Sequence, residues 1–120
     1  MNKFFLRLKK RRITKNYTIN HIRSSGHDIY IAYHGDIKIG KAFIYIKKRQ
    51  AILIDIVVYH LFRNKGIGSK LIKYIINELK GSDIICIKGE IKNKSVISFY
   101  LKLGFKYNEH GYVYKTLRDN

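Results

Sequence analysis

The hydrophobic pattern of this chain changes from strand to helical spacing at Ile67, and that change limits the fold more than any other feature. Three segments have the alternation or length of β-strands, Asp28–His34, Ile37–Ile46 and Ala51–Tyr59, and only short turns separate them. Connections this short join neighbouring antiparallel strands. From Ile67 the apolar residues recur at helical spacing instead. The chain is therefore predicted to open with an antiparallel meander and to continue with helices.

Two strand segments carry further information. A weak alternation over Tyr17–Ile22, followed by a Ser-Ser-Gly break, predicts one more strand ahead of the meander. The segment Ala51–Tyr59 is nearly continuously apolar and is interrupted only by Asp55. Such a run is typical of a strand that is covered on both faces of a sheet.

The first predicted helix carries six apolar residues at the spacing of one helical face: Ile67, Leu71, Ile72, Ile75, Ile76 and Leu79. We expect Gly81 to end this helix in the left-handed conformation. A short strand, Ile84–Ile87, follows. A second helix, closed by Gly104, has one face formed by Val96, Phe99, Tyr100 and Leu103. A hairpin over 107–117 completes the chain.

The composition indicates one globular domain. The chain has 120 residues, of which 46% are hydrophobic and 28% charged, and it contains no uncharged apolar run long enough to cross a membrane. The longest apolar run near the N-terminus has three residues, too few for a secretion signal. We therefore expect a cytoplasmic protein with no membrane partner. Residues 1–16 are predicted to form a basic segment and residues 17–120 a single domain.

Metal binding has no support in the sequence. The single cysteine, Cys86, lies within Ile84–Ile87, where a buried small apolar residue is expected and no disulfide can form within the chain. The five histidines share no helical i, i+4 spacing. No metal ligand is therefore predicted.

The charge of the chain has two interpretations. There are 25 Lys and Arg against 8 Asp and Glu, a net charge of +17, and residues 1–27 contain eight bases and no acid. Such an excess points to an anionic partner such as nucleic acid. The alternative is mutational bias in an AT-rich genome, because isoleucine outnumbers leucine 21 to 9 and proline is absent. Both interpretations stay open at this stage.

The segment Arg63–Ser69, Arg-Asn-Lys-Gly-Ile-Gly-Ser, lies between a predicted strand and the start of the first helix. Glycines allow a tight turn there, and backbone N–H groups at a helix N-terminus attract a phosphate or pyrophosphate. The pattern is not a P-loop, because GxxxxGK[ST] is absent, and it lacks the third glycine of a dinucleotide fingerprint. A helix that merely begins with a glycine turn is the alternative.

A second motif follows between Asn93 and Phe105, and the two together resemble the GNAT superfamily of N-acetyltransferases. The family pattern [RQ]xxGxG matches Arg63–Gly68 in full. The pattern NxxAxxxYxxxGF matches at Asn93, Tyr100, Gly104 and Phe105. Val96 stands where the family usually has alanine. The resemblance covers about Asp28 to Leu117.

The resemblance implies the fold class. It is α/β, of the α+β type, with a mixed, mostly antiparallel twisted sheet and two main helices. Between Tyr17–Ile22 and Asp28 there is no room for the two helices that help wall the acceptor site in this family. The N-terminal helices are therefore expected to be reduced or absent.

The resemblance also implies acetyl-CoA as cosubstrate, without a metal. The loop would hold its pyrophosphate through Arg63, Asn64, Lys65, Gly66, Ile67, Gly68 and Ser69. The strand end would pair with the pantetheine arm through Ile56, Val57 and Val58, and the Val58 N–H would polarise the thioester carbonyl. Asn93 would hydrogen-bond the arm, cap the second helix, or do both.

Tyr100 is the implied general acid that returns a proton to the departing thiolate, with core packing as the alternative. A general base has two candidates, Asp55 and Glu90, and water is a third route for the proton. Asp55 is either a perturbed functional group or a residue at a strand irregularity that faces solvent.

The expected function is direct acetyl transfer to an unidentified amine in a ternary complex. One alternative is a noncatalytic module that binds nucleic acid through its basic surface, of which Lys9-Lys10-Arg11-Arg12 is the best feature. Another is an acetyltransferase with an RNA-linked acceptor. The segment Lys3–Lys15 is interpreted as an accessory surface for an anionic partner. A second copy of the chain is a further candidate partner.

Overall fold

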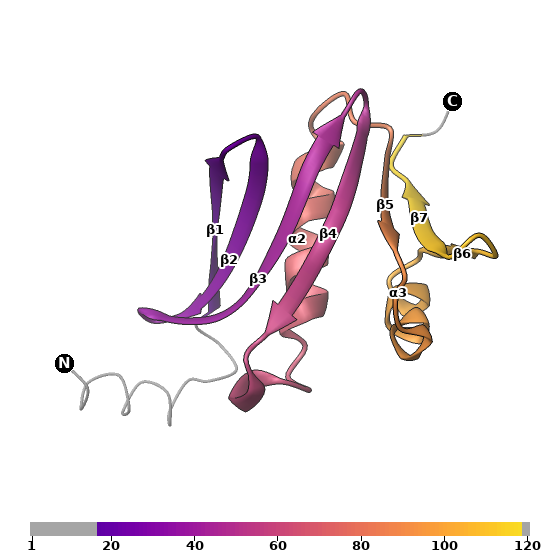
Figure 1. The fold of residues 1–120 in the computed structure, drawn as a ribbon. Coiled ribbons are helices and arrows are strands. Elements are labelled where there is room, and N and C mark those ends of the chain that lie inside the picture. Colours follow the sequence, from indigo (N-terminus) through magenta and orange to yellow (C-terminus); the bar gives the residue numbers. More distant parts are fainter. Residues whose placement is uncertain (1–16, 119–120) are drawn as a thin grey trace.

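One sheet organises the part of the chain that the computed structural model describes, residues 17–118. Its strand order is β1-β2-β3-β4-β5-β7-β6, and all neighbouring pairs are antiparallel except β4 and β5 (Figure 1). The strands are β1 Tyr17–Ser24, β2 His27–His34, β3 Ile37–Lys47, β4 Gln50–Val58, β5 Cys86–Glu90, β6 Lys106–Asn108 and β7 Tyr112–Thr116. The mixed, mostly antiparallel sheet confirms the predicted fold class.

The helices lie in two connections of this sheet. The long helix α2, Ile67–Lys80, joins β4 to β5, and the short helix α3, Ile97–Lys102, precedes β6. Two 3-10 turns, η1 His60–Phe62 and η2 Lys94–Val96, introduce them. The basic segment 1–16, with its run Lys9–Arg12, lies outside the described residues.

The first two strands are joined by two residues, Ser25 and Gly26, both with positive φ (52° and 78°). Two residues in this conformation make the turn that matches the twist of an antiparallel hairpin. No helix therefore stands between β1 and β2, as the spacing predicted.

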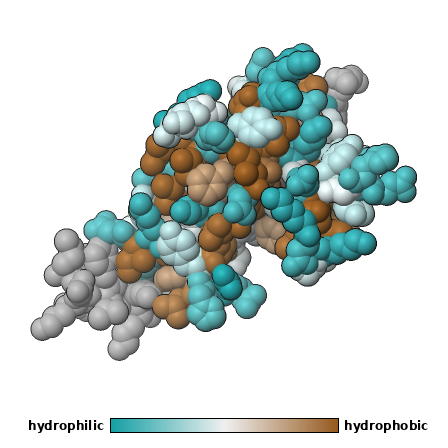
Figure 2. All heavy atoms as spheres, viewed as in Figure 1, coloured by the Kyte–Doolittle hydropathy of each residue, from teal (hydrophilic) through white to brown (hydrophobic). Residues whose placement is uncertain are grey.

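The hydrophobic core lies between the sheet and α2. Ile39 and Ile44 of β3 and Ile72 and Ile75 of α2 are at most 1% exposed. A polar contact crosses the same interface, because the Tyr30 hydroxyl donates to Glu78 Oε1 at 2.9 Å. Figure 2 shows the opposite face of the sheet, where apolar side chains lie among hydrophilic ones.

Two expectations about β4 and α2 are wrong. The second face of β4 is not covered, since Ile54 is 47% exposed. Gly81 ends α2 with φ −83°, in the right-handed region. Its amide donates to Glu78 O at 3.1 Å and the Ser82 amide donates to Leu79 O at 3.0 Å, so a tightened last turn closes the helix.

Two further side chains are less buried than the sequence suggested. Cys86 is half-buried. Val96, expected on the packed face of the second helix, is 39% exposed in η2 because it borders a cavity. No helix of the described residues is long and apolar enough to cross a membrane. Those residues also contain no cluster of three or more His, Cys, Asp or Glu that could hold a metal ion.

Candidate active site

The site begins where β4 separates from β5. The two strands pair in parallel only from Gln50 to Leu53, opposite Cys86 to Gly89. On its other edge β4 continues to pair with β3 as far as Val58, opposite Gly40. The segment Ile54–Val58 therefore has a strand partner on one edge only.

A β-bulge marks the point of separation. Leu53 pairs with Ile44 and Asp55 with Phe43, so Ile54 is an extra residue between consecutive pairs. A bulge bends its strand and increases the local twist. It lies directly after the last pair with β5, which accounts for the divergence of the two strands.

The backbone N–H and C=O of Val58 lie on the unpaired edge of β4, which faces the gap between β4 and β5. The Tyr59 amide donates to Ile39 O of β3 at 2.9 Å, whereas the Val58 carbonyl accepts from Arg63 Nε at 3.1 Å, away from β3. Neighbouring residues of a strand direct their backbone groups to opposite edges, and the N–H and C=O of one residue leave on the same edge. The Val58 N–H therefore points to the side of the gap.

The loop after β4 presents the N-terminus of α2 to the same gap. Asn64 and Gly66 have positive φ (63° and 79°), and Gly66 is the N-cap residue without a side-chain capping bond. The backbone N–H groups in the first turn of α2 therefore receive no hydrogen bond from an N-cap side chain. The Arg63 amide donates to His60 O at 3.3 Å and is therefore already engaged within the protein.

Gly68 packs where three elements meet. A Cβ placed on Gly68 would lie 3.4 Å from Phe99 Cζ of α3 and 3.8 Å from Val58 Cγ2 of β4. A side chain larger than methyl would press against Phe99 and Val58. Glycine therefore allows α2, α3 and β4 to pack closely at this point.

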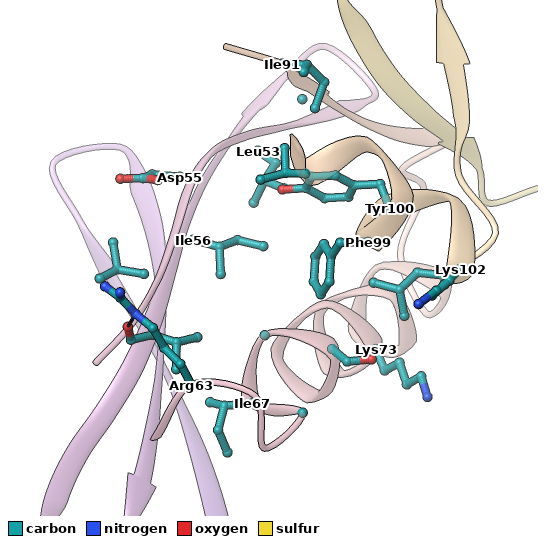
Figure 3. Close-up of a pocket in the computed structure, with 18 of the residues that line it drawn as sticks. Leu53, Asp55, Ile56, Arg63, Ile67, Lys73, Ile91, Phe99, Tyr100 and Lys102 are labelled. Atoms are coloured by element: carbon teal, nitrogen blue, oxygen red, sulfur yellow. Dashed lines mark hydrogen bonds between the residues drawn. The ribbon is translucent and has the colours of Figure 1, made fainter. Parts of the chain in front are cut away.

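These elements enclose a cavity of about 1110 Å³ between β4, β5, α2 and α3 (Figure 3). Its charged lining residues are the cations Arg63, Lys73, Lys92 and Lys102 and the acids Asp55 and Glu90. Most residues predicted for the site line it: Asp55, Ile56, Val57, Val58, Arg63, Asn64, Gly66, Ile67, Gly68, Ser69, Glu90 and Tyr100.

Tyr100 lies across the cavity from Ile56, beside Phe99 (Figure 3). Its ring meets those of Phe99 and Phe105 edge to face, with centroids 5.0 and 5.4 Å apart. Burial, and then the negative charge of Asp55, raise the pKa of the Tyr100 hydroxyl to about 12. The hydroxyl therefore keeps its proton at neutral pH.

The family now follows from the sequence match. Residues 25–107 match the family described as acetyltransferase (GNAT) domain. The chain belongs to the GNAT acetyltransferase family. The match covers both motifs and the meander between β1 and β4, so the cavity lies within the GNAT domain.

Solved structures show the same fold at low sequence identity. The ribosomal-protein-S18-alanine N-acetyltransferase of Escherichia coli superposes with a TM-score of 0.71, at 17% identity over 82% of this chain and 74% of that one. A GNAT acetyltransferase of Elizabethkingia anophelis, solved with acetyl-CoA bound, gives 0.70 at 19% identity over 79% of each chain. The KacTA–DNA complex gives 0.69 at 16% identity over 79% of this chain and 70% of that one. No curated protein sequence matches the chain significantly.

The two candidate bases of the GNAT domain differ in position. Asp55 is exposed at the bulge, and its carboxylate points away from the Tyr100 ring (Figure 3). Asp55 is thus exposed at a strand irregularity and still lines the cavity, and its part in proton transfer stays a prediction. Glu90 is exposed at the end of β5, opposite Tyr112 of β7.

Two predicted residues do not line the cavity, Lys65 and Asn93. Asn93 caps η2, because its side chain accepts from the Ser95 amide at 3.0 Å. Of its two expected roles, the cap is the one with a contact in the structure.

Sequence reasoning missed a second, smaller cavity of about 190 Å³ that shares Gly89 and Glu90 with the first. It is also lined by His110 and Tyr112, and Lys88 lies over the Tyr112 ring at 5.4 Å. The sequence marked His110-Gly111 only as a turn. No periodic signal joins it to Glu90, because the antiparallel pairing of β5 with β7 brings them together.

Proposed function

We propose that this GNAT domain transfers an acetyl group from acetyl-CoA directly to an amine acceptor, in a ternary complex without a covalent enzyme intermediate. One observation carries the proposal. The unpaired half of β4, the uncapped N-terminus of α2 and the Tyr100 hydroxyl border the same cavity.

The residues of the cavity fit the cosubstrate. The first-turn amides of α2, at Gly68 and Ser69, would hold a pyrophosphate at the positive end of the helix dipole. Arg63, Lys73, Lys92 and Lys102 supply positive charge around the cavity. The free edge of Ile56–Val58 offers backbone groups to an extended amide-containing chain, as an added strand would. Acetyl-CoA supplies the activated acetyl group, as a thioester.

The Val58 N–H is the donor for the thioester carbonyl. It points to the unpaired edge and needs no rearrangement to donate a hydrogen bond there. A fixed donor of this kind stabilises the negative charge that develops on the oxygen during attack, by about 3 kcal/mol. The half-buried Tyr100 hydroxyl then donates its proton to the departing thiolate sulfur.

The acceptor amine would enter from the side of the smaller cavity. Glu90 borders both cavities, so its carboxylate can receive the proton that the attacking ammonium must lose, directly or through water. Asp55 faces away from Tyr100 and is the second choice for this role.

The direct test is thiol release from acetyl-CoA across a panel of small amines, peptides and RNA with and without an attached amino acid. Tyr100→Phe keeps the ring and removes the proton donor, so turnover should fall about ten- to a thousandfold while acetyl-CoA affinity is retained. Tyr107→Phe is the matched control, since it makes the same change on an exposed ring that does not line the cavity. Equal turnover of Tyr100→Phe on every acceptor would assign Tyr100 to packing.

The same panel separates the second candidate, an RNA-linked amine as acceptor. The net charge of +17 favours it. Turnover confined to RNA-linked amines, and weakened by added salt, would select it over a small amine. RNA binding without thiol release would point to a noncatalytic module.

A further inference from the structure

Two side chains of opposite charge, Lys88 and Glu90, lie on the same face of β5. Ile87 is fully buried in the core on the α2 side of the sheet, so Lys88 and Glu90 face the other side. Both border the smaller cavity of about 190 Å³. The other residues around this cavity come from β4, β5, β7 and the turn before β7: Ile52, Gly89, His110, Gly111 and Tyr112.

The two charges have no charged partner in the described part of the chain. Within residues 17–118, neither the Lys88 ammonium nor the Glu90 carboxylate forms an ion pair. The Lys88 ammonium lies 5.4 Å from the centroid of the Tyr112 ring, so an aromatic face and not an acid holds this half-buried side chain. Both charges are therefore available to a ligand.

Glu90 connects this pair of charges to the proposed reaction. It borders both cavities, so an amine beside its carboxylate lies next to the gap between β4 and β5. The rest of such a molecule would extend past Ile52 and the Tyr112 ring toward Lys88. Residues two apart on a strand are separated by about 6.6 Å. A molecule whose amine is a few bonds from a second group can therefore reach both side chains.

The chemistry of that second group follows from Lys88. Another cation would be repelled by its ammonium, and an uncharged group would leave the ammonium without an anion. Lys92 adds positive charge at the larger cavity, and the chain as a whole carries a net charge of +17. An anionic group fits this surrounding better than a neutral or cationic one. The smaller cavity is below the size of sites that bury drug-sized ligands, so it suits a short molecule.

We propose that the acceptor is a short amine that also carries an anionic oxygen group, a carboxylate or a phosphate. Glu90 faces its ammonium, and Lys88, held over Tyr112, binds its anionic group. We call this second position the anion subsite. Lys88 is then a specificity-determining residue. The inference rests on the proposed acetyl transfer and adds to it the chemical class of the acceptor.

The first test compares amines that differ only in the anionic group. β-Alanine is paired with β-alaninamide, and phosphoethanolamine with ethanolamine, in the thiol-release assay with acetyl-CoA. We expect higher kcat/KM for the anionic member of at least one pair, and the pair concerned identifies a carboxylate or a phosphate. Lys88→Gln should lower that preference about tenfold. Intrinsic differences in amine reactivity are the same for both proteins and cancel in this comparison.

Lys41→Gln is the matched control. Lys41 of β3 lies over the Phe43 ring at 5.5 Å, as Lys88 lies over Tyr112, and it lines neither cavity. The substitution removes the same charge from the same kind of contact, so the preference for anionic amines should stay as in the wild type. Thermal unfolding checks that both variants are folded.

A binding measurement separates this inference from the proposed function. Saturation-transfer NMR follows the four amines on the protein with and without coenzyme A, which has no acetyl group to transfer. Loss of β-alanine or phosphoethanolamine binding in Lys88→Gln, without thiol release from any amine, would support the anion subsite and contradict acetyl transfer. Thiol release with equal preference in wild type and Lys88→Gln would overturn the anion subsite and leave acetyl transfer standing. Neither selective binding nor thiol release would overturn both.

Discussion

The two halves of β4 are almost equally apolar in sequence and differ in what surrounds them. Gln50–Leu53 pairs with a strand on both edges, and its residues Ala51 and Leu53 are 0% and 4% exposed. Ile54–Val58 pairs on one edge only and borders the cavity. The first half belongs to the core, with only Leu53 also touching the cavity, and the second half belongs to the candidate site.

The difference shows that the edge of an apolar strand becomes available to a ligand where the neighbouring strand no longer pairs with it, as β5 no longer pairs with β4 after Leu53. Ile56 and Val58 are half-buried and still pack against the core on their α2 side. Their backbone groups on the other edge are available to a ligand. The bulge at Ile54 separates the two functions within one strand.

The largest effect is expected at the loop facing the unpaired half. Gly68→Asp would place a carboxylate in front of the α2 amides, where the pyrophosphate is proposed to bind. Acetyl-CoA affinity should fall about a thousandfold, and because Gly68 is buried against Phe99 and Val58, the added carboxylate should also lower the free energy of unfolding. Isothermal titration calorimetry measures the affinity, and thermal unfolding measures the fold.

Gly68→Ala is the control for this change. Its Cβ would meet Phe99 at 3.4 Å, an ordinary contact, so the loss of affinity should be much smaller. Full affinity in a folded Gly68→Asp protein would contradict the assignment of the loop.

The next largest effects are expected from one substitution in each half of β4, which changes either stability or acetyl-CoA affinity. Leu53→Ala removes a buried side chain and should lower the free energy of unfolding by about 2–5 kcal/mol. Ile56→Ala removes a half-buried side chain that also lines the cavity, so it should cost less stability and lower acetyl-CoA affinity. Urea unfolding and calorimetry give both quantities. Leu53 also touches the cavity, so the outcome that contradicts the comparison is unchanged acetyl-CoA affinity in Ile56→Ala.

A smaller effect is expected from the basic run ahead of β1. Replacing Lys9, Lys10, Arg11 and Arg12 with glutamine should leave acetyl-CoA affinity unchanged, because these residues belong to neither half of β4. Binding to an anionic acceptor or to RNA should weaken by about tenfold at low salt and less at high salt. Fluorescence anisotropy across a salt series measures this. Identical curves for both proteins would favour genomic bias as the origin of the charge.

The smallest effect is expected on how the free energy of unfolding depends on pH above 10. The pKa of Tyr100 is about 12 in the folded protein and close to 10 in the unfolded chain. Between these values the unfolded chain binds fewer protons, so stability falls as pH rises from 10 to 12 and is unaffected below 10.

Tyr100→Phe should therefore flatten the profile in that window. Burial and the hydrogen bond to Glu78 also raise the pKa of Tyr30, so Tyr30→Phe should flatten it as well, independently of the cavity. Urea unfolding at fixed pH values measures the slope. An unchanged slope in Tyr100→Phe would mean that the hydroxyl is solvated in the folded state.

Local patterns predicted much of this structure. The alternation of β2 and β3 and the apolar stripe of α2 appear at the expected positions, because both report which side chains of one element are buried. The residues of the loop Arg63–Ser69 line the cavity as expected, apart from Lys65. The prediction that Gly81 adopts the left-handed conformation was wrong, because a right-handed last turn satisfies terminal carbonyls of α2 without it.

Strand alternation and helical spacing do not predict which residues far apart in the sequence pair with each other. Nothing near Glu90 predicts that β7 brings His110 and Tyr112 beside it. Asp55 was ambiguous for the same reason. Its position depends on an extra residue in the register with β3, which the order of residues in β4 does not reveal.

The sequence by itself determined the order of strands and helices, the turns without room for helices between β1 and β2, and the two motifs that mark the family. Tertiary structure alone decided where β4 leaves β5, which edge of β4 stays unpaired, and which face of the sheet packs against α2. The reason is physical. Periodicity records the burial of side chains within one element, whereas edges and faces depend on partners that the chain brings from far away.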